Sequence, residues 1–184
     1  ISPIIPGAHI ISEINSAFNN QLNIEETVTL GFGMFAAGTA WNIIPDDAYI
    51  TGNARYFDPV EGDKAFALIN RTIKNVAEIH RCGVEFDPTH RISPLPVVND
   101  AGVVERVRAN VVDACGEEVL GDCDRWFASE CYSAYLAKYP GALGLLGIRN
   151  EELGSGAAHH NGQFDLDESA LTLGVCTELA FALD

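Results

Sequence analysis

The sequence has little positive charge. Eleven lysine and arginine residues stand against 26 aspartate and glutamate residues in a chain of 184, which gives a formal net charge of −15. A surface with this charge repels the phosphates of nucleic acids and the headgroups of anionic lipids. The composition therefore argues against nucleic acids and membranes as partners.

Long apolar runs and several well-known site motifs are also missing. The apolar runs are short and broken by polar residues, so none is long enough to span a membrane. No glycine loop of the Walker or dinucleotide-binding type is present. Residues 1–7 have neither a basic region nor an apolar core, so we do not expect a signal peptide there. Because the chain starts at Ile1 and not at methionine, we expect a processed or excised fragment.

Cysteine is present, but not in a pattern that predicts a framework. The five cysteines are odd in number and none has CxxC spacing, which argues against paired disulfides or a zinc ribbon. We interpret most of them as small buried side chains in a reducing, cytoplasmic compartment. They are Cys82, Cys115, Cys123, Cys131 and Cys176.

Periodic patterns in the first half predict helices and strands in a definite order. Apolar residues at three- and four-residue steps predict a helix over about Pro6–Leu22. Alternation predicts strands at about Glu26–Phe35, with Val28, Leu30, Phe32 and Met34 on one face, and at Ala48–Tyr56. Asp58-Pro59 is typical of a helix start, and Gly83 is expected to end that helix. A short strand with Val84 and Phe86 completes the order α-β-β-α-β.

The second half predicts a different domain after the prolines at 94 and 96, so we divide the chain into residues 1–93 and 94–184. Asn99 or Asp100 can cap a helix that stops at Gly116. The apolar run 142–148 predicts a strand buried on both faces. Asp167 can cap a final helix over about Glu168–Leu183. Its expected buried stripe is Leu171, Val175, Leu179 and Leu183.

Three groups of residues could carry chemistry. His159 and His160, followed by Asp165 and Asp167, form the His/carboxylate cluster, although neighbouring histidines rarely bind one metal together and a zinc site needs three or four ligands. Asn42 and Arg55 could hold a carboxylate, because a guanidinium offers paired parallel donors. Ser129 and Glu130 form the third group. On the residues alone, loop histidines with helix-capping acids, a solvated strand face and an ordinary serine are the more common explanations of these patterns.

Five stretches in collinear order resemble the hippurate hydrolase, aminoacylase and carboxypeptidase family of metal-dependent amidohydrolases. The resemblance covers nearly the whole chain, and the order of the stretches is more specific than any one of them. They are GTAWNIIPD at 38–46, GNAR at 52–55, ASECY at 128–132, YPGALGLLG at 139–147 and HNGQFDLD at 160–167.

The resemblance implies an α/β protein with an α+β lid. Residues 1–93 would be a ferredoxin-like lid that lacks its first strand and dimerises. Residues 94–184 would be the C-terminal portion of an α/β zinc-peptidase-like catalytic domain. The implied reaction is hydrolysis of N-acyl amino acids or small peptides by two zinc or manganese ions, with a water deprotonated by a glutamate.

Roles carry over to only a few positions. His160 matches a metal ligand, Asn42 and Arg55 match residues that hold the substrate carboxylate or oxyanion, and Ser129 and Glu130 lie in a loop near the substrate. The remaining ligands and the general base have no counterpart here, so no catalytic residue is assigned. We expect this chain alone to be inactive, to bind metal weakly at most, and to work with an N-terminal half. The alternatives are a stand-alone, non-catalytic dimerisation or binding module, and a small metal site at His159 and His160.

Overall fold

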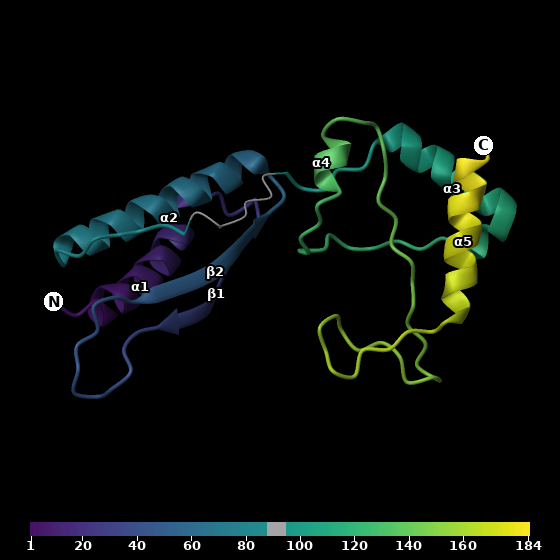
Figure 1. The fold of residues 1–184 in the computed structure, drawn as a ribbon. Helices are drawn as coiled ribbons and strands as arrows, with labels where there is room; N and C mark the ends of the chain where they lie inside the picture. Colours follow the sequence, from purple (N-terminus) through teal and green to yellow (C-terminus); the bar gives the residue numbers. More distant parts are fainter. Residues whose placement is uncertain (88–94) are drawn as a thin grey trace. The chain divides into compact units, whose positions relative to one another are not determined.

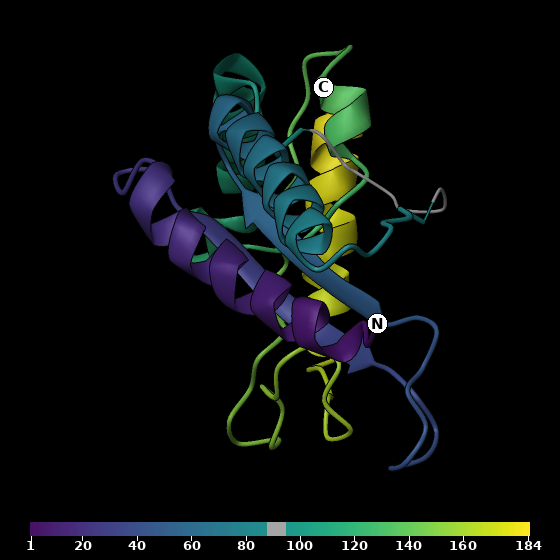
Figure 2. The same cartoon turned by 90° about the vertical axis from the view of Figure 1, so that its left-hand side faces the viewer.

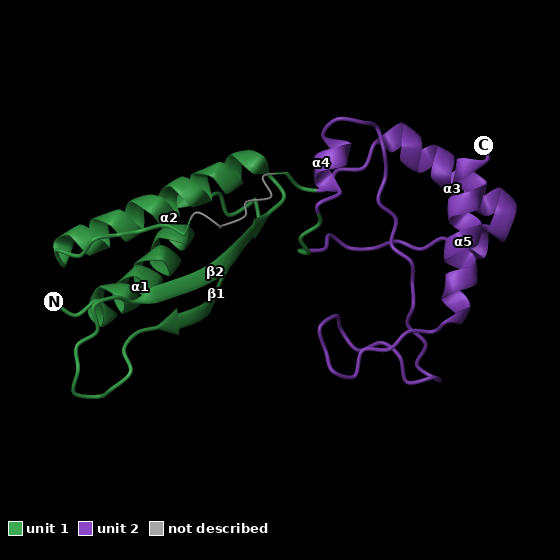
Figure 3. Ribbon diagram, in the orientation of Figure 1, with its two compact units in different colours: residues 1–96, 127–130 green, residues 97–126, 131–184 purple. Residues whose placement is uncertain are grey.

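A computed structural model describes residues 1–87 and 95–184, and its contacts separate into two compact units. Unit 1 comprises residues 1–96 and 127–130, and unit 2 comprises residues 97–126 and 131–184 (Figure 3). The expected boundary between residues 93 and 94 falls outside the described residues. No sequence pattern predicted that the segment 127–130 belongs with unit 1.

Unit 1 contains two helices and a two-stranded antiparallel sheet. Their order is α1 (Ile4–Gln21), β1 (Val28–Ala36), β2 (Tyr49–Tyr56) and α2 (Pro59–Ile79). Both helices lie on the same face of the hairpin (Figures 1 and 2). All four elements were predicted from periodicity to within a few residues, except for the end of α2. The strand expected at Val84 and Phe86 is not formed, because nothing in the described part of the chain pairs with its backbone.

The core of unit 1 is a small apolar cluster between the helices and the sheet. Ile10 and Ile14 of α1 meet Val76 of α2 at its centre, and Ile14 is only 1% exposed. The side chains packed around them, from all four elements, are Phe18, Leu30, Phe32, Ile50, Ile69 and Ile73. Burial of such side chains is the main driving force that holds the helices to the sheet.

A β-bulge interrupts the alternation of β1. Phe32 pairs with Gly52 and Met34 pairs with Thr51, so Gly33 is an extra residue without a partner in β2. The bulge reverses which side chains face the helices. The Phe35 ring lies so close to α1 that a Cβ added at Gly7 would be 2.8 Å from it. Alternation had placed Met34 on the buried face, and that placement was wrong because it assumed an unbroken period of two.

Both ends of α2 are closed by local hydrogen bonds. At the start, the Asp58 carboxylate accepts from the Val60 N–H at 2.7 Å, as the sequence predicts. At the end, the Cys82 N–H donates to the Ala77 carbonyl and the Arg81 N–H to the Glu78 carbonyl, which is a Schellman motif. Arg81 occupies its left-handed position with φ 56°. The prediction that Gly83 ends this helix was therefore late by several residues.

Unit 2 is built around one pair of helices. α3 (Ala101–Cys115) begins at Asp100, whose carboxylate accepts from the Val103 N–H at 2.9 Å. It ends at Gly116 with φ 95°, a conformation that favours glycine. α5 (Ser169–Ala182) packs along α3. The other elements are the short helices η1 (Glu117–Val119) and α4 (Ser133–Leu136).

Two expectations for unit 2 were wrong. Residues 142–148 form no strand, and both Leu145 and Leu146 are exposed. The apolar stripe of α5 faces away from α3, and all four of its members are more than half exposed. Both predictions assumed neighbours that would cover these side chains, and the described residues leave them largely uncovered. No helix in the described part of the chain is long and apolar enough to cross a membrane.

Candidate functional site

Arg55 ties the C-terminal end of β2 to the segment 127–130. Its Nη1 donates a hydrogen bond to the Phe127 carbonyl, and the Phe57 and Phe127 rings meet edge to face with centroids 4.5 Å apart. Ser129 and Glu130 follow directly in this segment, and both are exposed. All four predicted substrate-binding residues belong to unit 1, and Arg55, Ser129 and Glu130 are associated through this contact. Arg55 is half-buried and bonded, whereas the sequence suggested a solvent-facing side chain.

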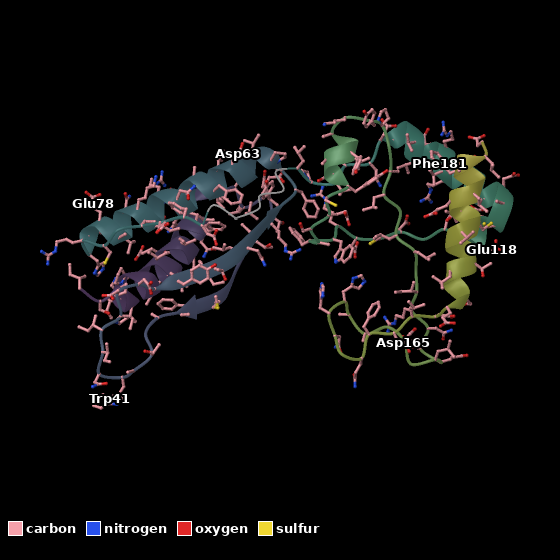
Figure 4. The ribbon with its side chains drawn as sticks, in the orientation of Figure 1. Trp41, Asp63, Glu78, Glu118, Asp165 and Phe181 are labelled. Atoms are coloured by element: carbon pink, nitrogen blue, oxygen red, sulfur yellow. The ribbon has the colours of Figure 1, made fainter. Side chains whose placement is uncertain are left out.

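Asn42 lies at the other end of the hairpin. The register pairs Thr29 with Arg55 and Ala36 with Tyr49, and Asn42 belongs to the loop beyond that second pair. Six residues of strand separate Tyr49 from Arg55, a length of about 20 Å. The loop tip is open to solvent, and Trp41 is 98% exposed there (Figure 4). The hypothesis that Asn42 and Arg55 of one chain converge on a carboxylate is therefore wrong.

His160 lies in the loop that precedes α5 in unit 2. It has a left-handed backbone, with φ 63°, and an exposed side chain. Its neighbour His159 has an aromatic setting, with ring centroids 5.4 Å from Trp126 and 5.3 Å from Phe164. Nowhere in residues 1–87 and 95–184 do three His, Cys, Asp or Glu side chains gather as a metal site. The residues present thus do not make a complete centre, and the alternative of a small site built on both histidines has no cluster to support it.

Hydrogen bonds from Asn150, Ser155 and Asp167 close the base of this loop. Asn150 Nδ2 donates to Asp167 Oδ2 at 2.7 Å, and the Asn150 N–H donates to Ser155 Oγ at 2.6 Å. Asp167 also accepts from the Ser169 N–H at 2.9 Å. The Asn150 bond, followed by the Ser169 bonds, lowers the pKa of Asp167 below its usual value. Two hydrogen bonds at the base of the histidine loop are therefore made to a carboxylate whose ionised form is favoured.

Acid should weaken this loop through Asp167. A lowered pKa means that the stabilisation is complete above the usual value of 3.8 and is lost as the pH falls through the folded-state value. In Asp167→Asn the amide would set an N–H₂ against the Asn150 donor, so we expect lower stability at neutral pH and a flatter dependence on acid. Trp126 fluorescence in a Trp41→Phe background measures unfolding of unit 2, since the chain has two tryptophans. Glu168→Gln is the matched control, and parallel acid curves for Asp167→Asn and the parent would contradict the assignment.

Two features were missed from the sequence because their members are far apart in it. A groove of about 590 Å³ runs between α1 and α2, lined by polar residues that include Glu13 and Arg71. At one end His80 Nε2 and His9 Nδ1 are 3.3 Å apart. In unit 2, the sulfurs of Cys115 and Cys176 are close neighbours. Helical spacing could have placed His9 and Glu13 on one face of a helix. No local sequence signal, however, predicts the contact of His9 with His80 or of Cys115 with Cys176, because each pair joins two different helices.

Comparison with known proteins shows that the chain is similar to hydrolases. No protein-family model matches it. It is 29% identical to thermostable carboxypeptidase 2 of Saccharolobus solfataricus, over 100% of this chain and 46% of that protein. It is 24% identical to IAA-amino acid hydrolase ILR1-like 2 of Arabidopsis thaliana (100% and 42%), and 26% identical to N-acetylcysteine deacetylase of Bacillus subtilis (94% and 43%).

A solved structure has the same fold. It is described as "a putative aminohydrolase from methicillin resistant Staphylococcus aureus", with a TM-score of 0.71 and 20% sequence identity. The match covers 99% of this chain and 46% of that one. The chain thus spans slightly less than half the length of the relatives it matches, and the resemblance to hydrolases named as carboxypeptidases, amino acid conjugate hydrolases, amidohydrolases and deacetylases is confirmed along its length.

Proposed function

We propose that this chain is the substrate-recognition and dimerisation part of a metal-dependent amidohydrolase that cleaves N-acyl amino acids or small peptides. The observation that carries the proposal is the match of almost the whole chain to one portion of proteins named for hydrolysis of such bonds. Unit 1 would be the lid, in the ferredoxin-like arrangement without its first strand. Unit 2 would be the end of the catalytic domain.

In this proposal Arg55 recognises the substrate carboxylate. A guanidinium has five N–H donors, so its bond to the Phe127 carbonyl leaves others for a carboxylate. The same bond positions the segment with Ser129 and Glu130, which would contact the rest of the substrate. Asn42 would act at a separate point, about the length of a strand away, and so would serve the site of another subunit.

The metal ions, which we propose to be two zinc or manganese ions, would be held mainly by the N-terminal half. This chain would contribute His160 alone, because no group of three potential ligands forms among its described residues. Such a single ligand supports weak metal binding at most. The general base would also lie in the N-terminal half, so we assign no catalytic residue to this chain.

The exposed stripe on α5 supports the idea of a larger protein. Its leucine and valine side chains recur at four-residue steps on the face opposite α3, where they leave apolar surface in water. Covering one such side chain typically contributes about 1.5–3 kcal/mol. An N-terminal half that packs here would therefore gain stability and complete the α/β domain.

Producing the chain together with its upstream coding region tests the proposal. We expect one polypeptide or a tight complex that releases free amino acid from a panel of N-acyl amino acids, with chelator-sensitive activity. The 184-residue chain alone should be inactive. If neither preparation is active and no N-terminal partner is found, the alternative function, a stand-alone, non-catalytic dimerisation or binding module, is favoured.

Unit 1 should form a homodimer. Within the described residues β1 pairs only with β2, so its outer edge has free backbone donors and acceptors, and α1 is the other available surface. Light scattering of the purified chain should give twice the monomer mass. Thr29→Lys would place a charge along the β1 edge and should weaken pairing there, while Lys74→Ala on α2 serves as a mild control. A strict monomer in the tens of micromolar range would count against the dimer.

A further inference from the structure

Cys115 and Cys176 bring their thiols together across the helix pair of unit 2. Cys115 is the last residue of α3, and Cys176 lies in the middle of α5. Their sulfur atoms are 2.7 Å apart although 61 residues separate them in sequence. This distance is less than 1 Å longer than a disulfide bond, which measures about 2.05 Å.

The helix register, and not a chance contact, sets this pairing. α3 and α5 lie side by side in Figure 1. The residues that contact each other run in opposite order along the two helices. Arg106 Nε is 3.4 Å from Asp184 Oδ2, and its guanidinium lies 4.6 Å over the Phe181 ring. One turn later Asn110 Nδ2 donates to the Ala180 carbonyl. Cys115 and Cys176 continue the same antiparallel series, so packing along the helices holds the two sulfurs together.

We propose that Cys115 and Cys176 are a modification site, a dithiol that closes to a reversible disulfide and locks α3 to α5. The sequence predicted that most of the five cysteines are small buried side chains, which was wrong: three are half-buried and two are exposed, and the structure brings the sulfurs of Cys115 and Cys176 together. The other three do not share this arrangement: Cys123 and Cys131 are exposed, and the Cys82 thiol donates to the His80 carbonyl in unit 1. The proposal does not depend on the proposed hydrolase activity.

A low-molecular-weight disulfide such as oxidised glutathione is the oxidant. One cysteine thiolate attacks a sulfur of the reagent, its S–S bond breaks, and a glutathione thiolate leaves. The second cysteine thiolate then attacks the protein sulfur of this mixed disulfide and releases the other glutathione thiolate. The two thiols lose two protons and two electrons in total, and one oxidised glutathione becomes two reduced molecules. Hydrogen bonding to Cys176 raises the pKa of the Cys115 thiol, so closure should quicken as the pH rises.

Oxidation of the intact 184-residue chain tests the site. After incubation with oxidised glutathione, we expect a mass lower by about 2 Da and a proteolytic fragment joining the Cys115 and Cys176 peptides. Closing a loop of this length should raise the thermal midpoint of unit 2 by roughly 10 °C, reversibly with dithiothreitol. Cys115→Ser and Cys176→Ser should each abolish the linked fragment and the shift, whereas Cys123→Ser should keep both.

Several results would overturn the proposal. An unchanged mass, glutathione adducts that never resolve, or a bond that joins other cysteines would each show that the two thiols do not react together. A linked fragment without a rise in the thermal midpoint of unit 2 would show that the disulfide does not stabilise the packing of α3 on α5. If a serine variant fails to fold, the fragment map of the wild-type chain decides alone.

Discussion

If the complete protein is the proposed amidohydrolase, replacing Arg55 by lysine in it should lower kcat/KM by about 10- to 150-fold. This range corresponds to about 1.5–3 kcal/mol, the usual scale for a hydrogen bond to a charged group. Lysine keeps the positive charge but lacks the planar fork, so it cannot bond the Phe127 carbonyl and a carboxylate in parallel directions. The loss should appear in steady-state kinetics with an N-acyl amino acid, while the circular dichroism melting curve stays close to that of the parent.

Arg71→Lys is the matched control for this variant. Arg71 also uses its guanidinium inside unit 1, bonding Gln21 Oε1 at 2.5 Å, but it lies on α2 away from the 127–130 segment. The Arg71→Lys variant should leave kcat/KM unchanged. Full activity of Arg55→Lys would eliminate its role in holding the carboxylate.

Mixing subunits shows whether the lid serves its own site or a neighbour's. Subunits with Arg55→Lys and subunits with His160→Ala should each be weak alone. If Arg55 acts in the partner's site, mixed dimers contain one site with both residues intact and regain part of the activity. Without such rescue, Arg55 acts within its own subunit.

Ile14→Ala should lower the free energy of unfolding of unit 1 by about 2–5 kcal/mol. Ile14 is at the centre of the cluster and 1% exposed, so its loss removes apolar contacts with both helices and the sheet and leaves a cavity. Because a whole domain is typically stable by only about 5–15 kcal/mol, a large fraction of the molecules should unfold at modest urea concentrations. Urea titration followed by circular dichroism measures the change.

Ile5→Ala makes the same chemical change in the same helix at a position 54% exposed. Its cost should stay within about 0.5 kcal/mol. Equal losses for the two variants would contradict the assignment of the effect to the cluster, because alanine is the better helix former at both positions.

Local patterns predicted the local structure well. Helix α3 is bounded by a capping aspartate at Asp100 and a glycine at Gly116, and both signals act through atoms within one turn. The periodicity of α1 located Ile10 and Ile14 in the core for a similar reason. At the site, the motifs named Arg55 with Asn42 and, separately, Ser129 with Glu130; the contact of Arg55 with the segment 127–130 was not anticipated, and the roles of these residues stay predictions.

Predictions that depended on distant partners fared worse. The run 142–148 and the α5 stripe have the apolar character of covered elements, yet periodicity does not say which segment covers them. The proximity of Cys115 to Cys176, which are 61 residues apart in sequence, depends on the packing of two helices, which spacing rules do not record. The expected meeting of Asn42 and Arg55 failed because a hairpin of this length places its loop far from its open end.

The bulge at Gly33 also sets the direction in which the hairpin loop leaves the sheet. Pairs from Val28 to Phe32 are unaffected by it, whereas the last three residues of β1 are turned over relative to an unbroken strand. The loop with Trp41 and Asn42 starts from those residues. The direction of the loop therefore depends on the presence of one extra residue in β1 more than on the identity of any side chain. Gain or loss of a single residue there would redirect the loop to the other face, which makes insertions and deletions, not substitutions, the changes that can alter what Asn42 reaches.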